Sequence, residues 1–103
     1  MKPDIESNNA SLENDLETLP DEVATALQLW RISTLDRERT EAILHARFKA
    51  EEERTATEVK ALINASPERY QAVLNEIKAE SEYTRLYERL MGAKKLASLR
   101  TAF

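Results

Sequence analysis

The side chains best suited to chemistry in this chain are few and lie far apart. His45 is the only histidine, with Glu41 one helical turn before it and Lys49 one turn after it. A metal site or a catalytic pair needs further nitrogen, sulfur or carboxylate ligands at the same level, and the chain has no cysteine and no second histidine. We therefore interpret His45 as a surface residue whose functional option is to modulate assembly as pH falls towards about 6.

The run of three glutamates at Glu51, Glu52 and Glu53 is the other pattern that resembles a cation site. Consecutive helical residues point about 100° apart, so these carboxylates cannot converge on one ion and are interpreted as a solvated face. The chain also lacks a glycine-rich phosphate loop and a pairing of nucleophile with base. The sequence therefore predicts no enzyme activity, no cofactor and no metal site.

Charge is distributed unevenly along the chain. Residues 1–22 carry seven acidic residues against one lysine, whereas residues 78–103 carry six basic residues against three acidic ones. The overall charge of −4 and the sequence pI of about 5.1 argue against nucleic-acid binding. We expect the basic cluster to capture an acidic segment, such as residues 4–22 of a neighbouring copy; its members are Arg85, Arg89, Lys94, Lys95 and Arg100.

The elements that carry these side chains are predicted to be helices. Between Asp21 and Met91 the chain has no glycine and a single proline, Pro67, which follows Ser66. Serine is a preferred helix cap, proline fits the first helical position, and Asn64 can end the preceding helix. We predict an all-α antiparallel two-helix hairpin, coiled-coil-like, with a helix over about 20–63, a turn at 64–66 and a helix over about 67–99.

The amino-terminal segment is treated separately from this hairpin. Residues 1–17 are acidic, rich in amides and poor in apolar side chains, which predicts a flexible segment. A short amphipathic helix is the alternative, because Leu12, Leu16 and Leu19 are spaced at helical intervals. Residues 18–103 are then the hairpin domain.

The second predicted helix carries a seam with the 4-3 spacing of a coiled coil, formed by Ala79, Tyr83, Leu86, Leu90, Ala93 and Ala97. A reversal at Ala65–Ser66 pairs residues whose numbers add up to about 131, which places Phe48 opposite Tyr83. Over residues 49–58 the only apolar side chains are two alanines, so we expect the hairpin to be weakest there.

Between Val23 and Leu35, apolar side chains lie on all sides of the first predicted helix. A single antiparallel helix covers only one of these sides. The remainder at this distal end has to be covered by the amino-terminal segment, by a second copy or by another protein. We expect a second copy, which gives a four-helix bundle from two hairpins. Trp30 is expected to act as an interface anchor. The predicted protein interface comprises Leu27, Leu29, Trp30, Ile32, Leu35, Leu96, Leu99 and Phe103.

The sequence leaves three functional classes open. The first is a non-enzymatic interaction or assembly module acting through the apolar distal end of the hairpin. The second is a small acidic inhibitor or regulator that binds a basic site on a partner protein, and the third is a DNA-binding accessory protein using the basic carboxy-terminal helix. No apolar run approaches the roughly 20 residues of a membrane span and no signal peptide is visible, so we expect a cytoplasmic protein.

The outline resembles, in shape alone, the small secreted proteins named for a Trp-x-Gly turn, which are also two-helix hairpins. The tripeptide itself is absent, because Trp30 is followed by Arg31 and Ile32 and lies far from the predicted turn. Shared shape carries no function with it. The assignment to a functional class therefore depends on which surfaces the helices leave uncovered.

Overall fold

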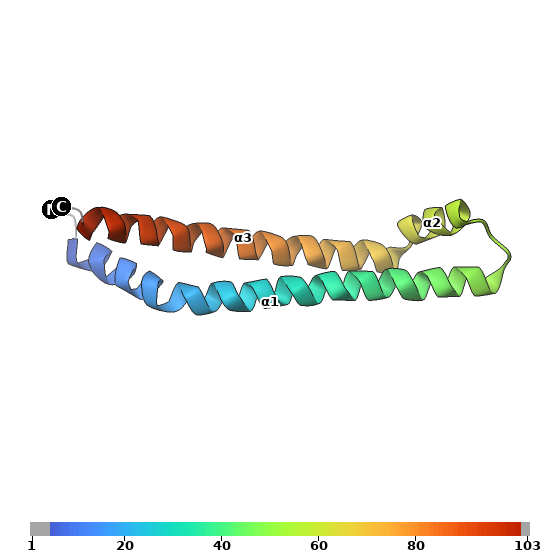
Figure 1. The fold of residues 1–103 in the computed structure, drawn as a ribbon, viewed down its shortest axis with the longest axis horizontal. Coiled ribbons are helices and arrows are strands. Elements are labelled where there is room, and N and C mark those ends of the chain that lie inside the picture. Colours follow the sequence, from blue (N-terminus) through green and yellow to red (C-terminus); the bar gives the residue numbers. More distant parts are fainter. Residues whose placement is uncertain (1–4, 102–103) are drawn as a thin grey trace.

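A computed structural model describes the backbone of residues 5–101, with side chains described from residue 10 onward. It is all-α, with helices α1 (Ile5–Glu51), α2 (Ala56–Ala65) and α3 (Pro67–Thr101). The long helices α1 and α3 lie side by side and run antiparallel, and the short α2 lies over the far end of α1 (Figure 1). The molecule is a rod with extents of 72 × 24 × 18 Å.

The chain reverses direction at residues 52–55, and not at the predicted turn over 64–66. The long first helix ends at Glu51, and α2 and α3 both run back along it (Figure 1). Ser66 instead joins two helices: α2 ends at Ala65 and α3 begins at Pro67. The Ser66 carbonyl accepts the Tyr70 N–H at 3.1 Å, so the predicted helix start at Ser66–Pro67 is confirmed. The predicted continuous helix over 20–63 is wrong.

The position of the reversal has a local physical cause. Glu51, Glu52 and Glu53 place negative charge at a helix C-terminus, where the helix dipole disfavours it. Thr55 then caps α2, because its Oγ1 accepts the Glu58 N–H at 3.2 Å. The connection is tied down by Arg54, whose Nη1 donates to the Phe48 carbonyl at 2.7 Å. The stretch predicted to be weakest is therefore where the helix stops.

The amino-terminal segment is more regular than predicted. Residues 5–17, expected to be flexible, form the first turns of α1, which continues through Pro20 without ending. These turns are inclined to the rest of the helix (Figure 1), and proline inside a helix is a known cause of such a bend. Leu12 and Leu19 are buried, so the leucine spacing was the decisive signal in this segment. Residues 1–4 lie outside the described part of the chain.

The predicted seam of α3 faces α1. Leu86, Leu90 and Ala93 are buried, and Ala79, Tyr83 and Ala97 are half-buried. The seam of α1 follows the same 4-3 spacing from Leu12 to Leu44. The centre of the core is a cluster of four buried side chains, Leu19, Ala26, Leu86 and Leu90.

The register between α1 and α3 differs from the predicted one. The Trp30 ring lies 5.4 Å from that of Tyr83, and Arg37 Nε lies 2.9 Å from Glu76 Oε1. In both pairs the residue numbers add up to 113, because the reversal occurs earlier in the chain than predicted. Phe48, predicted to face Tyr83, lies 18 residues beyond Trp30, which is about 27 Å along the helix.

Candidate functional site

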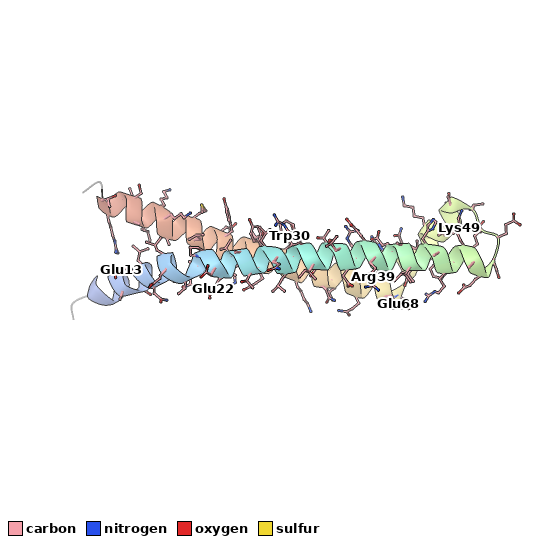
Figure 2. The ribbon with its side chains drawn as sticks, turned by 60° about the horizontal axis from the view of Figure 1, so that its bottom comes forward. Glu13, Glu22, Trp30, Arg39, Lys49 and Glu68 are labelled. Atoms are coloured by element: carbon pink, nitrogen blue, oxygen red, sulfur yellow. The ribbon has the colours of Figure 1, made fainter. Side chains whose placement is uncertain are left out.

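The corrected register gathers aromatic side chains on one side of the rod. Tyr83 stacks between Trp30 and Tyr87, at ring-centroid distances of 5.4 and 5.8 Å. Trp30 lies where α1 and α3 cross (Figure 2). We call this surface the aromatic flank, defined by Leu27, Trp30, Arg31, Thr34 and Leu35 of α1 with Tyr83 and Tyr87 of α3.

The aromatic flank is open to a partner. Its α1 residues line a groove of about 550 Å³, walled mainly by apolar atoms. Leu35 is 64% exposed and Tyr87 is 44% exposed, while Trp30 is only half-buried. Large apolar side chains that gather on one face and stay accessible mark an interaction surface.

The opposite side of the rod has a different character. Two grooves there, of about 390 and 520 Å³, run between α1 and α3 and contain Leu29 and Leu96 respectively. Four of their charged side chains form two pairs inside the hairpin, Asp15–Arg89 and Glu82–Arg85, both at 2.7 Å. Asp21, Glu22 and Arg100 also line these grooves and form no ion pair within residues 10–101. We call this surface the charged flank. A hydrogen bond from Arg85 lowers the pKa of Glu82 below its ordinary value.

The basic cluster predicted from the sequence is therefore only partly available. Arg85 and Arg89 already hold carboxylates of the same chain, and Arg100 lines the groove that contains Leu96. Lys94 and Lys95 are exposed on the last turns of α3. The acidic start of the chain does meet the basic end, because Asp15 of α1 binds Arg89 of α3.

A network of four charged side chains interrupts the seam beyond the aromatic cluster. Arg37 Nε donates to both carboxylate oxygens of Glu76, at 2.9 and 3.0 Å, and Arg37 Nη1 donates to Glu41. Arg69 Nε lies 3.3 Å from the same Glu41 oxygen. Hydrogen bonds to Glu41 and Glu76 raise the pKa of Arg37 above its ordinary value. The network joins α1 to α3 at one register only.

Glu76 stays charged in this partly buried position. Desolvation alone would raise its pKa, but hydrogen bonds from Thr34 and Arg37 outweigh that effect and hold the pKa below its ordinary value. Glu68, at the start of α3, has a lowered pKa because the Ser66 hydroxyl donates to it. Both lowered pKa values favour the ionised carboxylate of these residues in the folded protein.

The structure divides the predicted interface instead of bringing it together at one tip. Leu27, Trp30 and Leu35 lie on the aromatic flank, whereas Leu29 lines a groove on the charged flank; Ile32 is exposed. The apolar stretch from Val23 to Leu35 is mid-helix, so the predicted distal apolar tip is wrong.

The interface residues predicted on the second helix lie elsewhere. Leu96 shares a groove with Leu12, and Leu99 is exposed one turn further on, so neither lies at the level of Trp30. Phe103 lies outside the described residues. Tyr87, which completes the aromatic flank, was missed because it lies off the 4-3 seam of α3.

The residues whose side chains could support catalysis or metal binding lie apart from each other in the structure. His45 is exposed beside a groove of about 490 Å³ between α1 and α2, where Lys60 and Arg69 are its basic neighbours. Among the side chains of residues 10–101, no three histidines, cysteines or carboxylates are grouped as metal ligands. Within the same residues no helix has the length and apolarity to cross a membrane.

Comparison with protein-family models, with curated proteins and with solved structures finds no match to this chain. Its own surfaces are therefore what can indicate a function. Of these, the aromatic flank gathers three aromatic side chains, and none of the residues that line its groove forms an ion pair within residues 10–101.

Proposed function

We propose that this protein is a non-enzymatic assembly module that binds a helical partner through its aromatic flank. The observation that supports it is the gathering of the half-buried Trp30 and Tyr83 with the exposed Tyr87 on one side of a helical rod. Such aromatic side chains are the residues that most often dominate the energy of protein interfaces. Two further helices laid on this flank complete a four-helix bundle.

The large exposed surface of the chain supports this proposal. Its accessible area is 7894 Å², whereas a compact protein of the same mass exposes about 5900 Å². The radius of gyration is 21.8 Å, against about 13 Å for a compact chain of this length. Two helices cover each other along a single seam, so the remaining apolar side chains need a further partner.

The test compares two leucines of α1 that lie on different flanks of the rod. Leu35→Gln removes an apolar contact from the aromatic flank, and Leu29→Gln is the matched control on the charged flank, with similar exposure. Sedimentation equilibrium should show that Leu35→Gln weakens self-association about tenfold or more. Leu29→Gln should change it by less than about twofold. The reverse ranking would assign assembly to the charged flank.

A chain that stays monomeric calls for a different readout. A photo-crosslinking amino acid at position 35, introduced in the native host, should then form a discrete adduct with another protein. The same amino acid at position 29 is the control for non-specific capture. The proposed function is wrong if the purified chain stays monomeric and position 35 yields no more adduct than position 29.

A further inference from the structure

The unpaired charges of the aromatic flank specify the occupant of that surface and its direction. We propose that the occupant is a second copy of this chain, aligned with its chain ends at the same end of the rod, so that α1 of each copy lies on α3 of the other. This inference depends on the proposed function and adds the partner and the geometry of docking.

Exposed charged residues on the face of the aromatic flank are left unpaired. Residues a whole number of heptads apart lie on the same face of a supercoiled helix. On α1 and α3 these charged positions are Glu17 and Glu38 with Arg31 of the flank, Glu13 with Leu27, and Glu80 and Lys94 with Tyr87. All six charged residues are exposed, and within residues 10–101 none of them forms an ion pair.

The charged flank provides the contrast. There Asp15 pairs with Arg89 and Glu82 pairs with Arg85 inside one hairpin. Four of the seven charged residues that line the grooves of that flank are paired internally, whereas none of the six charged residues on the face of the aromatic flank is paired. Exposed charges around an apolar patch set the partner and the orientation of docking more than they set affinity.

The register of the hairpin places these charges at definite heights along the rod. Pairs between α1 and α3 add up to between 104 for Asp15–Arg89 and 115 for Arg47–Glu68. Lys94 therefore lies at the height of residues 10–21 of α1, which include Glu17, and Glu80 lies at the height of residues 24–35, which include Arg31. A twofold axis along the rod keeps every height unchanged and lays α1 on α3 of the second copy. Glu17 then faces Lys94 of the second copy, and Arg31 faces Glu80 of the second copy.

The same alignment brings the two aromatic clusters into contact. Trp30 and Tyr83 lie at one height, so the Trp30–Tyr83–Tyr87 stacks of the two copies meet around the axis. The surplus exposed area of about 2000 Å² per chain is more than the roughly 800 Å² per partner that a standard specific interface needs.

The opposite alignment of the second copy brings like charges together. If the second copy runs the other way with the Trp30 clusters superposed, α1 lies on α1, and facing residues add up to about 60. Arg31 then lies beside Arg31 of the second copy. This contact joins like charges, which costs stability.

Charge reversal tests the pairing of the two copies. Glu17→Lys alone and Lys94→Glu alone each place like charges at both symmetry-related contacts, so each homodimer should dissociate about tenfold more readily than the native protein. An equimolar mixture of the two variants restores opposite charges at both contacts. Sedimentation should then show a heterodimer of native affinity. Rescue by mixing also separates contacts between copies from contacts within one hairpin, which mixing cannot change.

A single spin label on each chain tests the direction in which the second copy lies along the rod. The chain has no cysteine, so Lys49→Cys gives one labelled site near the loop, about 21 Å along α1 from Leu35. Pulsed dipolar spectroscopy should find the two labels at the same height, separated only by the width of the bundle. Labels offset by about 60 Å along the rod would show the reverse alignment and overturn the inference.

Two other results would overturn it. In one, the mixture of Glu17→Lys and Lys94→Glu associates no better than either variant alone. In the other, the native chain is monomeric at all concentrations, which removes the second copy as occupant but leaves the proposed function to be decided by crosslinking at position 35.

Discussion

The two halves of the hairpin fill the same seam with different side chains. Between the chain ends and Trp30 the seam is apolar, with Leu19 fully buried against Leu86 and Leu90. Between Trp30 and α2 it contains Ser33, then Arg37 bound to Glu76. The apolar half buries apolar surface and so stabilises the hairpin, but leucine side chains can also pack when the two helices shift along each other. The polar half adds little net stability, but any other register would leave the partly buried charges of Arg37 and Glu76 without partners, which costs free energy. The difference assigns stability and register to separate halves.

Removing the most buried side chain of the apolar half should have the largest effect. Leu19 is fully buried, so Leu19→Ala leaves a cavity and should lower the free energy of unfolding by about 2–5 kcal/mol. Urea unfolding followed by circular dichroism measures this. Leu29→Ala, on an exposed site of the same helix, is the control and should lie within about 0.5 kcal/mol of native. Equal losses at the two sites would contradict the assignment of stability to the seam.

Breaking the polar half should cost less stability. Glu76→Ala leaves Arg37 without its partner on α3 and should lower the free energy of unfolding by about 1–3 kcal/mol. The double replacement Arg37→Leu with Glu76→Leu should instead raise the melting temperature while relaxing the register. Paired spin labels would then show a broader distance distribution than the native hairpin. A double variant with a lower melting temperature and an unchanged distribution would contradict the role of the network.

Acid should act through the lowered carboxyl pKa values. Glu76, Glu68 and Glu82 each have a pKa below the ordinary 4.5, so each contributes stability above pH 4.5 that is lost as pH falls through the folded-state pKa. Glu76→Gln cannot lose this contribution, and its melting temperature should fall less steeply than native between about pH 6 and pH 3. Parallel curves for the two proteins would show that Glu76 is not coupled to folding.

The smallest effect is expected at Gly92, on the charged flank. A Cβ added there meets no atom within 4 Å, so Gly92→Ala should stabilise α3 by about 0.5–1 kcal/mol. Self-association should be unchanged, because Gly92 lines a groove on the flank opposite to the proposed interface. Loss of association in Gly92→Ala would point to close helix approach on the charged flank.

Much of the fold follows from local sequence signals. The 4-3 spacing from Ala79 to Ala97 identified the seam of α3, and Ser66–Pro67 identified its first residue. The reversal was misplaced because the Ser-Pro step is equally suited to a turn and to a joint between two helices. The usable signal was Thr55 followed three residues later by Glu58, a capping pair directly after three glutamates.

The candidate site was harder to predict than the helices, because it depends on the register. Moving the reversal from residues 64–66 to 52–55 changes the partner of every residue of α1. Trp30 was identified as an anchor from its apolar surroundings alone, but its neighbours Tyr83 and Tyr87 follow only from the register. A one-dimensional pattern identifies the faces of a helix, whereas the point of reversal determines which faces meet.

The register is tested most directly by two intramolecular distances, measured with spin labels in protein diluted with unlabelled chain. The register of 113 predicts that labels at Gln28 and Arg85 lie at one height and that labels at Lys49 and Arg85 lie about 32 Å apart along the rod. A reversal at Ser66–Pro67 predicts the opposite order, with the Lys49 label close to Arg85 and the Gln28 label about 27 Å away along the rod. That opposite order would contradict the fold and, with it, the aromatic flank.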